Sequence, residues 1–192
     1  PTRNFVGIIR VQVKPKDAVA TPMVSAKQSS TVALKADGTV WTWGYNVAGQ
    51  LGNNSTADSL IPVQVLGGAT GNQYLTNVVQ VAAGGTFDGG NRYYALALRE
   101  NGTVWAWGYN AHGELGIGTA GGDHDHPEQV LRKENQSDPD SNNVPLTNIV
   151  KIAVGAYHNL ALTADGQVYA WGWGIYGSLG DGDTSDHSST VA

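Results

Sequence analysis

The sequence predicts an all-β fold built from three four-stranded antiparallel units, and three observations support this prediction. A stretch that runs from Ala33 to Gly52 occurs three times, with 64 residues between Trp43 and Trp107 and again between Trp107 and Trp171. Each copy places an Asp-Gly or Asn-Gly pair before a strand-like segment that ends on Trp-Gly. All six tryptophans lie inside these copies. Such a fixed period indicates a repeat architecture.

The turn signal in each copy predicts a β-hairpin. Asp-Gly and Asn-Gly favour two-residue type I′ turns, whose central residues both need positive φ. In the strand that follows, Val40 and Thr42 point to one face, and Trp41 and Trp43 point to the other. We therefore expect the tryptophans to pack between neighbouring sheets. The structural repeat positions are Asp37, Gly38, Trp43, Gly44, Asn101, Gly102, Trp107, Gly108, Asp165, Gly166, Trp171 and Gly172.

Along the chain, each unit shows about four strands, which is the content of one β-propeller blade. The second and third units open on Ile61-Pro62-Val63 and His126-Pro127-Glu128, and proline at a strand start fits a sheet edge. Residues 1–17 are predicted to be an N-terminal strand and linker, with the end of a preceding domain as the alternative. Three propeller repeats are predicted over 18–192, at about 18–60, 61–125 and 126–192.

Two insertions interrupt the repeat. Residues 86–92 lengthen the second unit, and residues 132–144 lie within the third. The second insertion is rich in Asp and Asn around a central proline, so we expect an exposed loop.

Composition narrows the function class. The formal net charge of −5 disfavours a nucleic-acid partner, which normally meets a basic face. Residues 1–35 carry a net charge of +5 and residues 36–192 carry −10. The absence of cysteine excludes disulfides and thiolate chemistry, and no apolar run is long enough for membrane insertion. Low lysine with abundant Asn, Thr, Gly and Ser favours an extracellular or cell-surface bacterial protein.

The repeated pattern Ala-Leu-x-x-Asp-Gly-x-Val-Trp-x-Trp-Gly, followed by Gly-Gln-Leu-Gly, resembles the repeats of the regulator of chromosome condensation family. The resemblance covers roughly residues 18–192 and implies a rigid, protein-binding β-propeller. Members of that family include an exchange factor for a small GTPase, but this chain is acidic and lacks a basic tail. Because propellers have about 4 to 8 blades, we expect either a fragment of a longer propeller or blades completed by another chain.

Candidate metal ligands occur in one cluster, Asp123, His124, Asp125 and His126. Alternate residues of an extended segment share a face, so either the aspartates or the histidines could chelate an ion, although no third ligand is identifiable. The segment 181–186 contains three aspartates and is better explained by turn chemistry. We expect no cofactor and no enzymatic activity, since no catalytic set shares a motif.

The favoured hypothesis is a non-enzymatic interaction module that binds a protein or glycan through the loops after each Trp-Gly pair. Aromatic residues near strand ends are efficient interface residues. The alternative is a homo-oligomer, a self-assembling subunit in which the basic first unit docks on the acidic third unit of another copy. The predicted partner-binding residues are Tyr45, Asn46, Tyr109, Asn110, His112, Trp173 and Tyr176.

Overall fold

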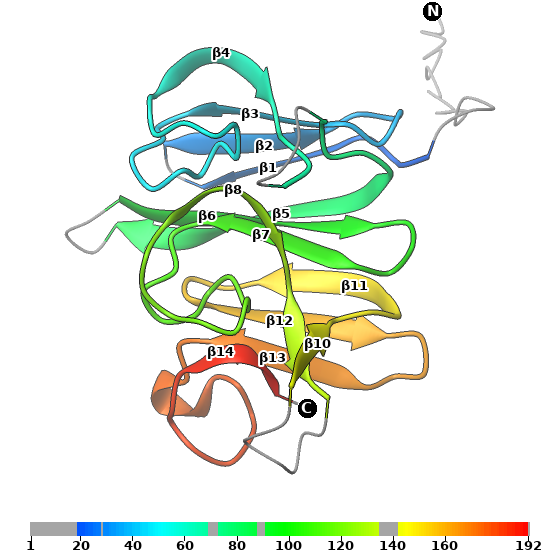
Figure 1. Cartoon of the computed structure of the whole chain (residues 1–192), viewed down its shortest axis with the longest axis vertical. Coiled ribbons are helices and arrows are strands. Elements are labelled where there is room, and N and C mark those ends of the chain that lie inside the picture. The colour runs from blue at the N-terminus through cyan, green and yellow to red at the C-terminus, as the bar shows by residue number, and fades with distance from the viewer. Residues whose placement is uncertain (1–18, 28, 69–72, 88–90, 135–141, 192) are drawn as a thin grey trace, which may run out of the picture.

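The computed structural model describes residues 19–27, 29–68, 73–87, 91–134 and 142–191, and within them the chain forms three stacked β-sheets (Figure 1). The first sheet contains β1 (Met23–Lys27), β2 (Ser30–Leu34), β3 (Val40–Gly44) and β4 (Ser59–Gln64). The second contains β5 (Val78–Phe87), β6 (Asn91–Arg99), β7 (Val104–Gly108) and β8 (His124–Gln129). The third contains β11 (Ile149–Val154), β12 (His158–Thr163), β13 (Val168–Gly172) and β14 (His187–Val191), and two further short strands beside β14 make this sheet six-stranded. The predicted all-β fold of four-stranded antiparallel units is confirmed.

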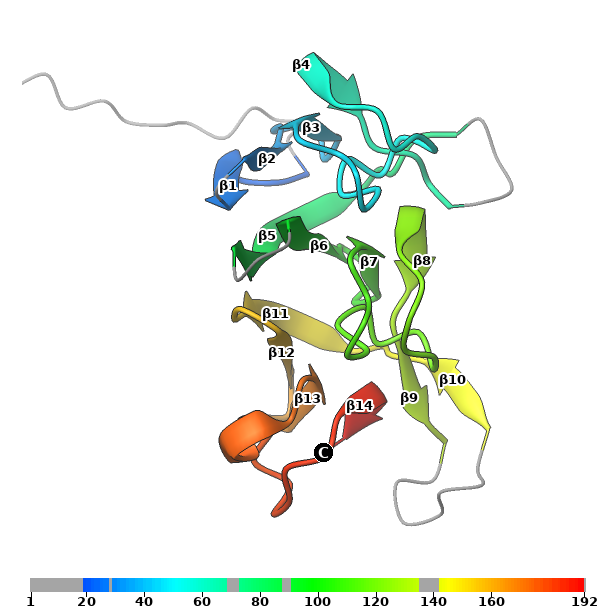
Figure 2. The ribbon, with the colours of Figure 1, turned by 90° about the vertical axis from the view of Figure 1, so that its left-hand side faces the viewer.

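The three sheets are arranged alike. Their first strands, β1, β5 and β11, lie on one side of the stack, and β4 and β8 lie on the opposite side (Figure 2). β1 and β2 pack on β5, and β11 packs on β5 and β6. The predicted segment 1–17 lies outside the described residues. No helix among the described residues is long and apolar enough to cross a membrane.

The Pro-Val strands pair differently from our expectation. They were expected to open the second and third units, but β4 pairs with β3 and β8 pairs with β7, so each closes the sheet before it. The antiparallel ladder places the strand after each Trp-Gly loop beside the strand before it. β4 and β8 are edge strands of their sheets. The N–H groups that Pro62 and Pro127 lack therefore remove no hydrogen bond from the middle of a sheet.

The hairpins after the Asp-Gly and Asn-Gly pairs form, but their turns are not type I′. Of the turn residues only the glycines Gly38, Gly102 and Gly166 have positive φ. The Lys35 carbonyl accepts the Gly38 N–H at 3.0 Å, and the Lys35 N–H donates to the Thr39 carbonyl at 3.0 Å. Three residues, 36–38, therefore form the loop, which needs one left-handed residue where type I′ needs two.

The insertions extend strands. β5 and β6 pair as far as Phe87 and Asn91, so the first insertion lengthens this hairpin. At the second insertion, β9 (Leu131–Lys133) pairs with β10 (Asn143–Pro145), and β9 also runs parallel to β14. The expectation of a loop throughout 132–144 is therefore wrong at both of its ends. Backbone pairing with a neighbouring edge strand satisfies groups that a loop would expose. Residues 135–141 lie outside the described part.

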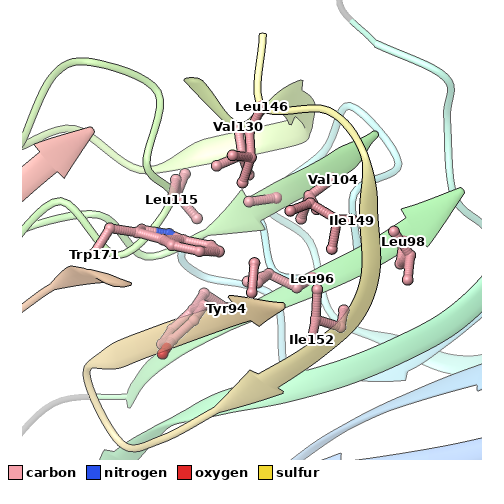
Figure 3. Packing of buried hydrophobic residues seen from close by; sticks show 12 residues of the cluster. Tyr94, Leu96, Leu98, Val104, Leu115, Val130, Leu146, Ile149, Ile152 and Trp171 are labelled. Atoms are coloured by element: carbon pink, nitrogen blue, oxygen red, sulfur yellow. The ribbon is translucent and has the colours of Figure 1, made fainter. Parts of the chain in front are cut away.

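The alternation of small and large residues builds the core. Val32, Leu34 and Val40 face the second sheet and pack with Ala97 and Trp107. The next junction repeats this pattern, and Figure 3 shows the Trp171 indole between Leu115 on one side and Tyr94 on the other, at the junction of the second and third sheets. Both tryptophan side chains are 0% exposed. The predicted inter-sheet packing of the repeat tryptophans is thus confirmed at these two positions.

One tryptophan hydrogen bond recurs at each junction. The Trp107 indole N–H donates to the Gln50 carbonyl at 2.9 Å, and the Trp171 indole N–H donates to the Glu114 carbonyl at 3.0 Å. Each accepting carbonyl belongs to the Gly-x-Leu-Gly stretch of the preceding sheet. A buried indole requires such an acceptor. The hydrogen bond therefore fixes how each sheet docks on the one before it.

Candidate interaction surface

The predicted contact residues lie in the Trp-Gly loops, which we define as residues 45–58, 109–123 and 173–186. The glycine that opens each loop bends the chain sharply. Gly44, Gly108 and Gly172 have φ between 103° and 108°, where glycine is favoured. A Cβ at Gly44 would lie 2.1 Å from the Ser29 carbonyl oxygen. The bend gives the next residue, which is aromatic in all three copies, the same backbone position.

The hydrogen bonds of that aromatic residue confirm the equivalence. The N–H groups of Tyr45, Tyr109 and Trp173 donate at 2.8–2.9 Å to carbonyls of the preceding part of their sheets. Tyr109 also lies beside a cation, because the Arg92 guanidinium is 5.7 Å from the ring centroid. All three aromatic side chains are partly exposed. The structure thus places three equivalent aromatic residues at the loop end of the sheets.

The predicted contacts Asn46 and Asn110 are corrected, because both side chains are completely buried. Asn46 accepts the Leu51 N–H at 2.8 Å, and its amide donates to the carbonyls of Ser55 and Ala57. Asn110 likewise accepts the Leu115 N–H at 3.0 Å. A buried amide that satisfies several backbone groups holds its loop from inside. These asparagine side chains therefore shape the loops from inside and do not lie at the surface.

The third loop lacks this anchor, because Gly174 stands where the first two loops have asparagine. Its backbone turns through the short 3-10 segment η1 (Ile175–Gly177). Tyr176 within it has φ of 61° and a side chain that is 93% exposed. A non-glycine residue with positive φ costs free energy. Here that conformation projects an aromatic ring into solvent.

An aromatic cluster, which we define as His112, Tyr157 and Trp173, lies between the second and third loops. The rings of His112 and Trp173 are stacked, with centroids 4.8 Å apart. Tyr157 meets Trp173 edge-on at 4.9 Å. His112 Nδ1 also lies 3.0 Å from Asp186 Oδ2. The cluster therefore fixes the relative positions of two neighbouring loops.

Glu114 lies beneath this cluster and is 0% exposed. Its Oε2 accepts the His112 N–H at 2.8 Å, whereas its Oε1 has no partner among the described residues. Burial raises the pKa of Glu114 to about 7. Nearby Asp186 also raises this pKa, and His112 lowers it. The carboxyl thus titrates at neutral pH, directly behind the surface residues.

Of the predicted metal ligands, His124 pairs with Glu128, and Asp125 and His126 pair with each other. His124 Nδ1 lies 2.6 Å from Glu128 Oε1, and His126 Nδ1 lies 2.8 Å from Asp125 Oδ1. Burial raises the pKa of Asp123. Among the described residues the group whose ligand atoms lie within 4.8 Å of one another is Asp181, Asp183 and His187.

That group belongs to a tight turn. Asp181 and Asp183 each accept a backbone N–H two residues ahead, at 3.3 and 2.7 Å. These hydrogen bonds are typical of aspartate turns. They agree with the turn chemistry expected for residues 181–186.

Several residues of the surface were not predicted. Tyr157 and Asp186 join the aromatic cluster, and Arg92 covers Tyr109. Tyr157 ends the turn before β12, and it meets the third loop only because Trp173 returns beside it. Glu114 was not predicted either. The sequence carried one signal for it, because Glu114 stands where the otherwise matching stretch of the first copy has Gln50.

The stacked four-stranded sheets, the recurrent indole hydrogen bond and the clustered loops define a repeat β-propeller module with a loop face. The sequence profile described as "Regulator of chromosome condensation (RCC1) repeat" matches residues 37–87 and 101–162. A second profile of the same repeat matches residues 78–114 and 149–178. The chain belongs to the RCC1 repeat family, a family of β-propeller protein-interaction modules.

Relatives in eukaryotes share this repeat. The chain is 34% identical over 164 residues to human E3 ubiquitin-protein ligase HERC2, a match that spans 85% of the chain and 3% of HERC2. It is 29% identical to the ultraviolet-B receptor UVR8 of Arabidopsis thaliana, over 91% of the chain and 34% of UVR8. Protein pim1 of Schizosaccharomyces pombe is also 29% identical, over 85% of the chain and 29% of pim1. The chain spans about a third or less of these relatives.

Solved structures give a looser match. Human WBSCR16 superposes with a TM-score of 0.46 at 20% identity, over 88% of this chain and 51% of that one. Yeast RCC1 (Prp20), in its complex with Kap60, gives a TM-score of 0.46 at 18% identity, over 88% of this chain and 48% of that one.

Proposed function

We propose that the chain is a non-enzymatic interaction module that binds a protein or glycan partner through its Trp-Gly loops. The observation that supports this most is the aromatic cluster beside the exposed Tyr176. Rigid aromatic residues with part of their area open to solvent supply large contact area at low entropic cost. Trp173 is already held by its contacts with His112 and Tyr157, so binding does not have to immobilise it.

The charge around this surface favours a neutral or cationic partner. Residues 152–192 contain four aspartates and no lysine or arginine. Three of these aspartates lie between Asp181 and Asp186, in the third Trp-Gly loop. Like charges across an interface cost free energy, so an acidic partner is disfavoured. The composition of the chain supports a secreted or cell-surface bacterial setting.

A binding screen tests the proposal. The immobilised chain would be offered a defined glycan array and a displayed peptide library, and each ligand found would be titrated against Tyr176→Ala. We expect affinity to fall at least about tenfold, as for an aromatic residue central to an interface. Tyr74→Ala is the control, because Tyr74 is 51% exposed but lies outside the three loops. Ligands that bind both variants as tightly as wild type would refute the assignment.

Self-assembly is the second candidate function, and the apolar faces at both ends of the stack favour it. Val24 on the first sheet is 67% exposed, and Leu160 and Val168 on the third are 37% and 48% exposed. Apolar area of this kind is removed from water when another sheet covers it. Four of the basic residues expected to assist, Arg3, Arg10, Lys14 and Lys16, lie outside the described residues. Light scattering across concentration and salt tests this candidate.

A further inference from the structure

The junction between the second and third sheets differs from the first junction in three polar positions. Glu114, Asn159 and Tyr94 are buried there. The residues at the equivalent positions of the first junction are Gln50, Ala95 and Ser30. The second junction therefore places a carboxyl group where the first has a carboxamide, and it adds an amide and a phenol from the neighbouring strands.

Two oxygen atoms in this junction lack a hydrogen-bond donor. The Glu114 backbone carbonyl accepts the Asn159 amide at 2.7 Å, and the carboxyl Oε2 accepts the His112 N–H at 2.8 Å. By contrast, Glu114 Oε1 and Asn159 Oδ1 are buried and have no partner among the described residues. While the carboxyl is ionised both atoms are acceptors, so neither can satisfy the other. A buried acceptor without a donor costs free energy.

A single proton removes this mismatch. A protonated carboxyl carries one O–H donor, so a proton on Oε1 turns an acceptor without a donor into a donor. The side chain of Asn159 already contacts Glu114, and its Oδ1 is the acceptor that needs a donor. The hydrogen-bond geometry of the junction therefore favours the neutral carboxyl.

The charges around the carboxyl come from three elements. The titratable groups that face Glu114 are His112 of its own loop, Asp186 of the third loop and Tyr94 of β6. Burial is the main cause that raises the pKa of Glu114, Asp186 also raises it, and His112 lowers it. Burial raises the pKa of Tyr94 well above its ordinary value, so the phenol stays neutral where the carboxyl titrates. Burial and the Asp186 charge thus favour the same protonated form as the hydrogen bonds do.

Glu114 is connected to the interaction surface through His112. Its Oε2 holds the His112 N–H, and the His112 ring stacks on Trp173 with centroids 4.8 Å apart. His112 Nδ1 lies 3.0 Å from Asp186 Oδ2, and Asp186 Oδ1 accepts the Gly174 N–H at 3.1 Å. An ionised carboxyl in a dry site gains free energy when water reaches it, which requires the loop above it to open. The contacts listed here pass such an opening on to the third loop.

We propose that Glu114 is a proton-controlled latch for the interaction surface. With the proton on Oε1, the carboxyl donates to Asn159 Oδ1, and the second and third Trp-Gly loops hold the aromatic cluster in its binding arrangement. When the proton is lost, the carboxylate draws water into the junction, the two loops separate, and the surface releases its partner. The inference rests on the proposed binding through the Trp-Gly loops and adds that acid favours this binding.

Hydrogen exchange of the intact chain tests the latch without a partner. The protection factors of the Leu115 and Gly116 amides, which correct for the effect of pH on exchange chemistry, should fall at least about tenfold between pH 5 and pH 8. A pKa of about 7 in the closed loop and 4.5 in an open one sets the upper limit at about seventyfold. Glu114→Gln should remove the pH dependence.

The first loop is the internal control, because Gln50 stands there at the position of Glu114. The equivalent amides, those of Leu51 and Gly52, should keep their protection from pH 5 to pH 8. An equal fall in both loops would show that the carboxyl acts only through global unfolding, and unchanged protection in the second loop would show that no latch exists. Either result overturns the inference.

A second variant separates the carboxyl from the neighbouring imidazole, because imidazoles also change charge between pH 5 and pH 8. His112→Phe keeps a ring beside Trp173 and keeps the backbone N–H that Glu114 accepts. The pH dependence of the second loop should therefore persist in this variant. Its loss in His112→Phe, with retention in Glu114→Gln, would assign the effect to the histidine and overturn the inference.

Binding is then measured at pH 5 and pH 8 with ligands from the screen that carry no titratable group, such as a neutral glycan or a peptide without histidine or acidic residues. Wild type should bind about threefold or more tightly at pH 5, and Glu114→Gln should bind equally at both pH values. Equal affinity of wild type at both pH values would overturn the regulation. If the screen yields no ligand, the proposed function fails, while hydrogen exchange still decides whether the latch exists.

Discussion

Glu114→Gln should change how stability depends on pH. Glu114 stands where the first loop has Gln50, whose Oε1 accepts the Ala48 N–H at 2.8 Å as Glu114 Oε2 accepts that of His112. Glutamine can keep this hydrogen bond, but it carries no charge. The substitution therefore removes the cost of ionising a carboxyl that is 0% exposed, while it leaves the loop geometry in place.

The magnitude follows from the pKa of the carboxyl. Burial raises the pKa of Glu114 from 4.5 in the unfolded chain to about 7 in the folded protein. As pH rises from 4.5 to 7, the unfolded chain loses its proton first, so stability falls across this window and levels off above it. Each unit of difference is about 1.4 kcal/mol, so the total loss is about 3 kcal/mol. Between pH 5 and pH 8, wild type should lose about 2.5 kcal/mol relative to the variant.

Urea denaturation, followed by tryptophan fluorescence from pH 5 to pH 8, measures this difference. Using the change with pH, rather than stability at one pH, cancels the cost of the unpaired amide N–H that glutamine introduces. Glu100→Gln is the control, because Glu100 is exposed and its profile should follow that of wild type. Parallel profiles for wild type and Glu114→Gln would show that the carboxyl does not titrate near neutrality in the folded protein.

Three further substitutions test the junctions and loops. Trp107→Phe removes an indole hydrogen bond and leaves a buried carbonyl unpaired, so the free energy of unfolding in urea should fall by about 1–3 kcal/mol. Trp43→Phe in the monomer should lower it less. Asn110→Ala should also cost about 1–3 kcal/mol and speed amide exchange throughout its loop, and unchanged exchange would contradict the anchoring role. Gly102→Ala should lower the free energy of unfolding more than Gly166→Ala does. Both glycines have positive φ, but among the described residues only Gly102 lies against another sheet. Equal losses of stability would assign the whole effect to backbone strain.

The repeat predicted the fold well, because its signals are local. Alternation in the Trp strand and a glycine-containing turn are properties of adjacent residues, so hairpins and buried tryptophans follow from them. The type of turn does not follow from these local signals, because Asp37 followed by Gly38 suits both a type I′ turn and a three-residue loop. The sheet that the Pro-Val strand joins is likewise not set by adjacent residues. It depends on where the chain runs after the Trp-Gly loop, which is a non-local property of the fold.

The surface was predicted only in part, for the same reason. Tyr109, Trp173 and Tyr176 follow from their position after the repeat strand, and the structure leaves them at the surface. Asn46 and Asn110 share that position but are drawn inward by unpaired backbone groups of their own loops. Whether a polar residue turns inward or outward depends on which backbone groups the folded loop leaves unsatisfied, and this is not visible in the sequence.

The connections between sheets show where this scaffold can grow. In the first connection, Leu66 and Tyr74 form a single β-bridge, and in the second the same place is occupied by the hairpin of β9 and β10. Both connections lie at the rim of the stack, on the side that carries β4 and β8 (Figure 2), and the residues that flank them, Val65 and Leu75 in the first and Val130 and Leu146 in the second, stay buried in the inter-sheet cores. Chain length can therefore be added at the rim over evolution, or by grafting in the laboratory, without disturbing the contacts that set the spacing of the blades.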